Sequence, residues 1–274
     1  MELLAGPVER AFELLAGRRM VALTGAGVST DSGIPDYRGP DSPPRKPMTY
    51  QEFVSGERAQ RRYWARSHVG WARMAKALPN DGHRALAGLE REGTLLGLIT
   101  QNVDGLHAAA GSRAVIDLHG RIADVVCLGC RRRCSRADLQ ERLAALNRGF
   151  VEAAGAAIDS APDGDAVLEA VDGFRLAWCT GCGGVLKPDV VFFGENVPRD
   201  RVERAYAMVD AAEAMLVAGS SLAVLSGLRF VRHARQRGLP IVIVNRGSTR
   251  GDELADVLID AGCSEVLPAL LAAR

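Results

Sequence analysis

The chain has 274 residues, of which 47% are hydrophobic, 24% charged and only 5% aromatic, which is the composition of a globular protein. The formal net charge of +1 excludes binding to nucleic acid or membranes through overall charge. The sequence contains no run of about 18 apolar residues, so no membrane-spanning helix is predicted. The beginning of the chain lacks the pattern of a secretion signal. Without such a signal, six cysteines are expected to bind metal or take part in catalysis rather than form disulfides. We therefore expect a cytoplasmic protein.

Short apolar runs alternate with helical patterns along most of the chain. A helix is expected at 7–17 and a buried strand at 20–23. Further buried strands are expected at 95–100, 114–118, 214–218, 240–244 and 256–259, and helices at 83–92, 201–212 and 227–237. This alternation predicts an α/β fold with a Rossmann-like, doubly wound parallel sheet.

Two stretches interrupt the alternation. Residues 36–78 are rich in proline, arginine and aromatics and predict a loop followed by helices, whereas 121–187 contain five of the six cysteines. The second stretch includes a predicted helix at 137–146 and a loop at 153–166 that is rich in Gly, Ala and Asp. We expect a smaller domain, made of a helical module (36–78) and a zinc-binding module (121–187). It is inserted into a Rossmann-like domain made of 1–35, 79–120 and 188–274.

Four cysteines form two C-x-x-C pairs, Cys127 with Cys130 and Cys179 with Cys182, separated by 48 residues. Structural zinc prefers four tetrahedral thiolates, and one tight turn offers two of them. A single pair would also fit a redox site, but two pairs favour one structural Zn(II) ion. Cys134 lies nearby and is expected not to be a ligand.

A glycine pair follows the first predicted strand, in the stretch Gly25-Ala26-Gly27-Val28-Ser29. Glycines at this place let a phosphate approach the backbone and the N–H groups of the next helix. The dehydrogenase fingerprint is nevertheless broken, because Thr30 replaces its third glycine and no acidic strand end follows about 20 residues later. The sequence thus argues against a dehydrogenase.

Other predicted strands also end in polar residues. Thr100-Gln101-Asn102-Val103-Asp104, Gly219-Ser220-Ser221 and Asn245-Arg246-Gly247 each follow a buried run. Ligands of open α/β sheets bind beyond the carboxyl ends of the strands, so these segments fit one extended dinucleotide. Ordinary turns and a helix cap are the alternative interpretation.

The order of these motifs resembles that of the sirtuin family along nearly the whole chain. The resemblance rests on Gly25–Ser29, Gly33–Arg38, Thr100–Asp104, Leu118-His119-Gly120, the two cysteine pairs, Val191–Glu195, Gly219–Ser221 and Asn245. The segments 62–66, 69–71, 187–194 and 249–254 are most similar to its class II branch. The resemblance implies an enzyme that consumes NAD to remove acyl groups from lysine. The products would be nicotinamide, free lysine and an O-acyl-ADP-ribose.

The resemblance also implies roles for particular residues. His119 would be the general base that deprotonates a ribose hydroxyl, since imidazole titrates near neutrality. Asn102 would be the second catalytic residue and, with Asp104, would hold the nicotinamide and its ribose. The residues expected to contact NAD are Gly25, Ala26, Gly27, Ser29, Asp36, Tyr37, Arg38, Gln101, Asn102, Asp104, Gly219, Ser220, Ser221, Asn245, Arg246, Gly247 and Cys263.

Two segments are expected to contact the acylated substrate. Val191-Phe192-Phe193-Gly194-Glu195 would be an extended segment that pairs with the peptide backbone and so tolerates many sequences. Tyr63 and Arg66 are spaced as in a sirtuin branch that recognises a carboxylated acyl group, and Arg binds carboxylates through its planar fork. This favours the hypothesis of long or carboxylated acyl chains, with an ordinary surface Tyr and Arg as the alternative.

Two other functions fit the same motifs. Mono-ADP-ribosyl transfer to protein would use the same first half of the reaction, and an NAD-binding sensor would bind without turnover. We expect acylated-lysine proteins or peptides as partners, and neither nucleic acid nor a membrane.

Overall fold

The computed structural model describes residues 2–38, 46–154, 163 and 171–272. Its helices are α1 (Glu2–Leu15), α2 (Tyr50–Val54), α3 (Glu57–Met74), α4 (Asp81–Arg91), α5 (Leu106–Ala109), α6 (Arg136–Leu146), α7 (Phe150–Ala154), α8 (Arg199–Asp210), α9 (Leu225–Gln236) and α10 (Cys263–Ala272). Its strands are β1 (Met20–Thr24), β2 (Leu95–Thr100), β3 (Val115–Asp117), β4 (Gly120–Cys127), β5 (Arg133–Ser135), β6 (Leu186–Val190), β7 (Ala214–Ala218), β8 (Ile241–Val244) and β9 (Val257–Ile259). None of the described helices is both long and apolar enough to cross a membrane.

Six parallel strands form the larger sheet, in the order β3-β2-β1-β7-β8-β9. The chain runs outward from β1 to β3 and then returns to build β7, β8 and β9 on the other side. The sheet is therefore doubly wound, and the predicted fold class is confirmed. The reversal beside β1 creates the crevice in which ligands of such sheets bind.

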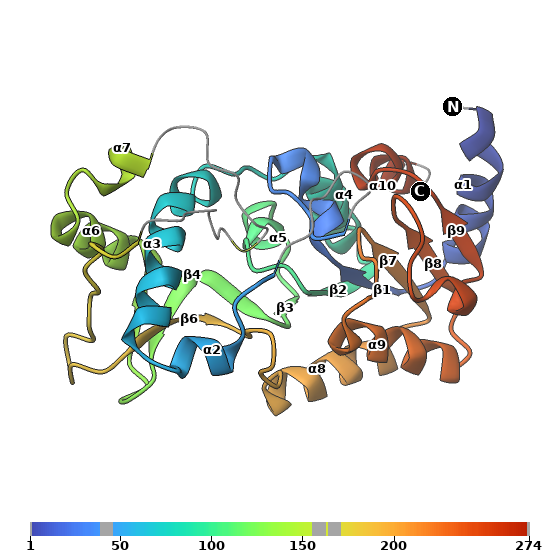
Figure 1. Ribbon diagram of the computed structural model, residues 1–274. Coiled ribbons are helices and arrows are strands. Elements are labelled where there is room, and N and C mark those ends of the chain that lie inside the picture. The colour runs from blue at the N-terminus through green and yellow to red at the C-terminus, as the bar shows by residue number, and fades with distance from the viewer. Residues whose placement is uncertain (1, 39–45, 155–162, 164–170, 273–274) are drawn as a thin grey trace.

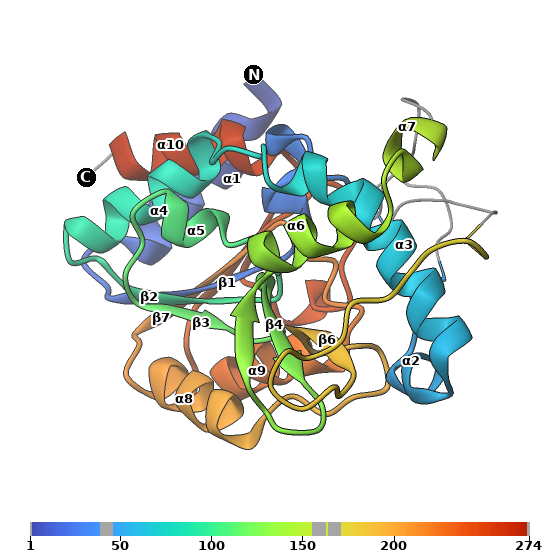
Figure 2. The same ribbon diagram turned by 90° about the vertical axis from the view of Figure 1, so that its left-hand side faces the viewer.

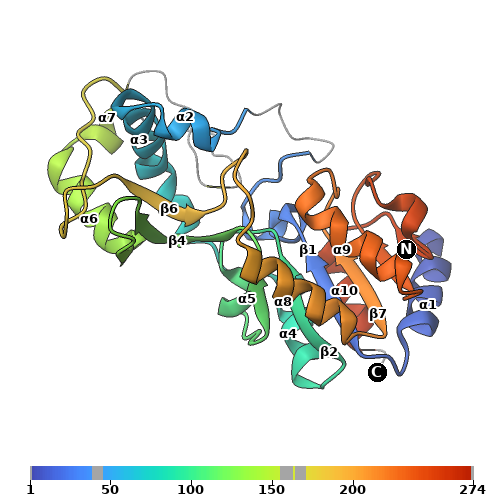
Figure 3. The ribbon, with the colours of Figure 1, turned by 90° about the horizontal axis from the view of Figure 1, so that it is seen from below.

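Helices cover both faces of this sheet (Figures 1 and 3). Helices α1, α4 and α10 pack on one face through a core that includes Leu15, Leu89 and Leu267. Helices α8 and α9 pack on the other face through a second core that includes Val209 and Phe230. β1 and β7 are buried along their whole length, as expected for central parallel strands. The sheet with these helices is called the sheet region below.

Most of the remaining elements form a second, smaller unit that lies beside the sheet in Figure 1 and in front of it in Figure 2. Strands β5, β4 and β6 make an antiparallel sheet, and helices α2, α3, α6 and α7 gather around it. A third core lies here and includes Phe53, Trp64 and Phe174. We call these elements the inserted region, because the chain enters it from the sheet region twice, after η2 (Thr30–Ser32) and after β3.

Most predicted strands and helices agree with the structure within about two residues at their boundaries. Three features differ. The sequence analysis missed α10, whose segment is almost entirely apolar and contains Pro268, and it missed the three-stranded sheet. Helix α1 begins earlier than predicted, at Glu2, with Pro7 inside it. Of the loop predicted at 153–166, residues 153 and 154 belong to α7, and the rest lies outside the described residues except for Asp163.

Candidate functional site

A cavity of about 630 Å³ lies where the carboxyl ends of β1, β2 and β7 meet the inserted region. Most of the predicted site residues share this cavity although they come from distant parts of the sequence. The predicted residues that line it are Gly25, Ala26, Gly27, Ser29, Asp36, Tyr37, Arg38, Tyr63, Gln101, Asn102, Asp104, His119, Val191, Phe192, Phe193, Gly194, Glu195, Gly219, Ser220, Ser221, Asn245, Arg246 and Gly247. Arg66 and Cys263 do not line it.

His119 lies between β3 and β4, where the chain passes from one sheet to the other. Its Nδ1 is 3.0 Å from the carbonyl oxygen of Gln101, so Nδ1 carries a hydrogen and donates a hydrogen bond to this carbonyl. Burial lowers the pKa of His119 to about 4, and the carbonyl of Gln101 only partly offsets this. The imidazole is therefore neutral at pH 7, and its Nε2 offers a lone pair, as a general base requires.

The side chain of Gln101 joins two strand ends. Its Nε2 donates to the hydroxyl of Ser220 at 2.8 Å, linking the loop after β2 to the loop after β7. Gly227 of α9 lies against the same side chain, and a Cβ atom there would be 2.6 Å from Oε1 of Gln101. Gln101 therefore fixes the carbonyl group that orients His119.

Asn102, Asp104 and Ser29 form a hydrogen-bonded cluster at the floor of the cavity. The amide nitrogen of Asn102 donates to the carbonyl of Gly25 at 3.0 Å and to the hydroxyl of Ser29 at 3.1 Å. Asp104 accepts from the Ser29 hydroxyl at 2.7 Å and from the backbone N–H of Leu106 at 2.8 Å. Burial raises the pKa of Asp104, while these two bonds lower it. The cluster fixes the loop after β1 against the loop after β2.

Gly25 and Gly27 have a structural purpose beyond the one predicted. A Cβ at Gly25 would lie 2.8 Å from the carbonyl oxygen of Gly219, and one at Gly27 would lie 2.9 Å from the Cα of Gly219. The N–H groups of Gly25 and Gly27 donate to the carbonyls of Ala218 and Gly219. The segment then continues as 3-10 turns rather than as an α-helix with free N–H groups. These glycines therefore let two strand-end loops approach each other within backbone contact.

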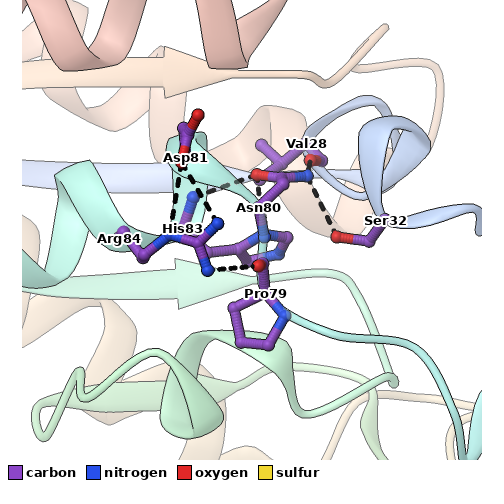
Figure 4. A network of polar contacts seen from close by, with 7 residues as sticks. All are labelled: Val28, Ser32, Pro79, Asn80, Asp81, His83 and Arg84. Carbon is purple, nitrogen blue, oxygen red and sulfur yellow. Dashed lines mark hydrogen bonds and ion pairs between the residues drawn. The ribbon is translucent and has the colours of Figure 1, made fainter.

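The sequence analysis missed a set of polar residues that supports this floor (Figure 4). Asn80 caps α4, accepting from the N–H of His83 at 3.2 Å, and its Nδ2 donates to the carbonyl of Val28 at 2.7 Å and to the hydroxyl of Ser32 at 3.0 Å. His83 reaches the hydroxyl of Ser29 at 3.4 Å. The Asn80-to-His83 spacing of an N-cap box was the available signal.

His107 lies behind the floor and does not line the cavity. Its ring contacts that of His83 in a tilted arrangement with 4.8 Å between the centroids, and its Nε2 is 2.9 Å from the hydroxyl of Thr24. Burial lowers the pKa of His107 to about 3 and that of His83 to about 4. Both rings are therefore neutral supports at pH 7.

The 191–195 segment forms one wall of the cavity. The N–H of Val191 donates to the carbonyl of His119 at 2.8 Å, and Phe193 forms a parallel bridge with Thr49. Glu195 accepts from the N–H of Phe192 at 2.7 Å and pairs with the buried ammonium of Lys187 at 2.9 Å. Only Phe193 is bridged, so the segment is an irregular wall rather than a regular strand.

One group of apolar side chains in the cavity lining belongs to, or packs against, the core of the inserted region, and this part of the lining is called the apolar recess. It consists of Ile34, Met48, Tyr63, Val103, Val190 and Phe192. Tyr63 is 4% exposed, and its ring lies 5.2 Å from that of Phe192 and 5.5 Å from that of Phe53. Arg66 is on the same helix but is offset from Tyr63 by roughly 60° around its axis. It is not part of the lining of the recess.

The far end of the cavity lies at the loop after β8. Nδ2 of Asn245 donates to the carbonyls of Arg246 and Gly247, and the N–H of Gly247 donates to Asp260. Cys263 begins α10 and is 3% exposed, and burial raises its pKa to about 12. Its side chain therefore belongs to the core beside the cavity.

The four paired cysteines come together in the inserted region. The sulfur atoms of Cys127, Cys130, Cys179 and Cys182 lie within 4.8 Å of one another, and all four thiols are free of disulfides. The closest pairs are 3.5 Å and 3.7 Å apart. Ligands about 2.3 Å from a tetrahedral zinc ion are roughly 3.8 Å apart, so the cluster fits one structural Zn(II) ion.

The backbone around the cluster suits thiolate ligands. The N–H groups of Cys130 and Gly181 point at the sulfurs of Cys127 and Cys179, at 3.5 Å and 3.4 Å. A Cβ at Gly184 would lie 3.0 Å and 3.1 Å from the sulfurs of Cys127 and Cys182, so a side chain here would crowd the cluster. Cys134 lies on β5 and is outside this cluster of four described cysteines.

The fold and the site together define a class. The protein is an α/β protein with a Rossmann-type parallel sheet. A cavity lies between this sheet and a smaller region that contains a cluster of four cysteines. The Sir2 family model matches residues 25–226, and the chain belongs to the Sir2 family.

Individual relatives agree with this assignment. The chain is 60% identical to NAD-dependent protein deacetylase 1 of Mycobacterium avium, with 94% of this chain and 92% of the relative covered. It is 56% identical to NAD-dependent protein deacetylase 1 of Streptomyces coelicolor, with 86% and 79% covered. A solved structure described as "Sir2-p53 peptide-NAD+" shares 31% identity and a TM-score of 0.78, with 97% and 98% covered.

Proposed function

We infer that the protein is an NAD-dependent protein lysine deacetylase that cleaves NAD and releases the free lysine. The observation that carries this conclusion is the place of His119. Its neutral imidazole opens onto the same cavity as the strand-end loops and the 191–195 segment. The relatives at 60% and 56% identity are named for this activity. The substrates are NAD and an acylated-lysine protein or peptide.

We assign each wall of the cavity one task in the reaction. The loops after β1, β2, β7 and β8 hold the NAD, with Asn102 and Asp104 at the nicotinamide end and Asn245 at the other end. The 191–195 segment pairs with the peptide backbone. His119 takes a proton from a ribose hydroxyl at Nε2, because Nδ1 is already bonded to Gln101. Attack by the acyl oxygen on the ribose carbon precedes this step and releases nicotinamide.

The apolar recess is the proposed acyl site. Apolar side chains line it, and burying a carboxylate among them without a partner would be costly. We therefore propose that acetyl and other uncharged acyl groups are preferred over carboxylated ones. Tyr63 contributes its ring to this recess, and Arg66 takes no part in acyl selection.

An acyl-peptide panel with NAD tests the function and the acyl preference together. Acetyl, lipoyl, succinyl and methylglutaryl lysine peptides are compared by nicotinamide release, and mass spectrometry identifies O-acyl-ADP-ribose or modified protein. Transfer of ADP-ribose to protein without deacylated peptide would replace the proposal with mono-ADP-ribosyl transfer, and no nicotinamide release would leave an NAD-binding sensor. Faster turnover of succinyl than acetyl peptide, lost in Arg66→Ala, would restore the carboxylated acyl hypothesis.

The zinc cluster and the compartment complete the proposal. The four thiols hold a structural Zn(II) ion, and the ion has no part in the reaction because the cluster is separate from the cavity lining. We place the protein in the cytoplasm, where the reducing environment keeps such thiols available for zinc.

A further inference from the structure

Ser226 lies beside the general base but was not among the residues the sequence predicted. It is the second residue of α9, it lines the cavity, and its Oγ is 2.8 Å from Nε2 of His119. Among the described residues, its hydroxyl has no other hydrogen-bond partner. This bond occupies the nitrogen that must accept the substrate proton.

The direction of the bond follows from the other side of the ring. Nδ1 carries the proton that goes to Gln101, so in the neutral ring Nε2 is an acceptor and Ser226 must be the donor. The N-terminal end of α9 also disfavours a positive charge at this point. When Nε2 gains a proton, the hydroxyl needs only to rotate to become the acceptor. Serine can thus bond to Nε2 in both protonation states.

The surrounding contacts give Ser226 a fixed position. The Gln101 side chain bonds to Ser220 at one end of the 219–226 loop, and its backbone carbonyl bonds to His119. Gly227 packs on the same glutamine at the other end of the loop. The two ring nitrogens of His119 are therefore bonded to Gln101 and to Ser226, and the Gln101 side chain packs against the start of α9.

We propose that Ser226 is a positioning residue for His119: its hydroxyl donates to Nε2 until the ribose hydroxyl takes its place as donor, and it accepts from the resulting N–H after proton transfer. This inference rests on the proposed deacetylase function. The ribose oxygen gives its proton to Nε2, and Ser226 gains and loses no proton in the net step. Its role therefore falls in the second half of the reaction, after nicotinamide has left.

Four forms of the full chain separate the hydroxyl from the size of the side chain: wild type, Ser226→Ala, Ser226→Thr and Ser226→Val. Threonine keeps the hydroxyl, and valine is nearly its isostere without it. Deacetylation of an acetyl-lysine peptide reports the whole reaction, whereas exchange of labelled nicotinamide into NAD reports only the first half. We expect the Ala and Val variants to deacetylate roughly tenfold or more slowly, because a positioned proton acceptor contributes about 10²–10⁴-fold. Nicotinamide exchange and the KM for peptide should stay within about twofold, and Thr should recover most of the rate.

Three outcomes would overturn the role of Ser226. They are wild-type deacetylation in the Ala variant, equal rates in the Thr and Val variants, and a parallel loss of exchange and deacetylation, which would indicate general damage to the site. If the Ala variant fails to fold, the Thr and Val pair still decides the question. A wild-type protein that exchanges no nicotinamide in the presence of acetyl peptide would instead refute the proposed function.

Discussion

The sheet region and the inserted region are stabilised in different ways. In the sheet region, β1 and β7 are fully buried between two layers of helices, and apolar side chains form the core on both faces. The inserted region has a three-stranded sheet, four clustered thiols, and Arg136, which is fully buried between Trp64 and Trp71. Apolar side chains form the cores of both regions, but the inserted region also contains four clustered thiols and a fully buried guanidinium. Variants of each region should therefore respond differently.

Loss of one zinc ligand should have the largest effect on folding, and the unfolding should begin in the inserted region. Cys182→Ser is expected to lose bound zinc and at least about 99% of deacetylase activity, because structural zinc contributes roughly 10–16 kcal/mol to folding of small sites. Metal analysis and activity measure this outcome. Cys134→Ser is the matched control, since Cys134 is outside the cluster. Equal zinc content in both variants would refute the site.

Removal of the base should abolish chemistry without unfolding either region. His119→Ala is expected to lower deacetylation by about 10²–10⁴-fold, the usual contribution of a positioned base. Binding of NAD should persist. His233→Ala is the control, because His233 pairs with Asp210 on the protein surface. Near wild-type deacetylation by the His119 variant would contradict its role.

Contact between the β1 and β7 loops should make the sheet region sensitive to one methyl group. Gly27→Ala puts a Cβ 2.9 Å from the Cα of Gly219, and backbone atoms there cannot move aside cheaply. We expect a loss of about 1–3 kcal/mol in the free energy of unfolding and a higher KM for NAD. In Gly173→Ala the new Cβ would have no atom of the described residues within 4 Å, so this variant should unfold like the wild type. Equal denaturation midpoints would argue against close loop contact.

Acid should weaken the sheet region through His83 and His107. Burial lowers their pKa values to about 4 and about 3, from an unfolded value of 6.5. The unfolded chain binds these protons first, so stability is full above pH 6.5 and falls as the pH drops toward about 4. Each histidine should cost about 1 kcal/mol between pH 7.5 and pH 5.5. Urea unfolding at both pH values measures this, and His107→Asn should reduce the dependence. If the unfolding free energy of His107→Asn depends on pH as that of the wild type does, the His107 ring is already charged or hydrated in the folded protein.

The same contrast explains what the sequence could predict. Strands that are buried on both faces have continuous apolar sequences, so the six strands of the larger sheet were predicted almost to the residue. The cysteine pairs and the strand-end loops were found because their residue types and spacing carry the chemistry. The small sheet was missed because β4 and β5 have no clear alternation. The segment of α10 was missed because it is apolar on all sides.

Contacts that join distant segments could not be predicted in the same way. Nothing in the sequence near His119 indicates that Ser226, 107 residues later, bonds to it. The sequence suggested that Gly25 and Gly27 serve a phosphate, but it did not indicate that the folded chain also brings Gly219 against them. Both relations arise from the order of strands in the sheet, which places β7 beside β1.

The bridge between Thr49 and Phe193 has a consequence for how the substrate acts on the enzyme. A peptide that adds to the 191–195 segment would add backbone hydrogen bonds to a segment that one bridge already joins to the inserted region. Because the peptide would bind the closed form of this wall and not the locally opened form, its binding would shift the opening equilibrium toward the closed form. Amide hydrogens near Phe193 should then exchange more slowly with solvent when acetyl peptide is bound. The substrate would act as a stabilising ligand of the wall that recognises it.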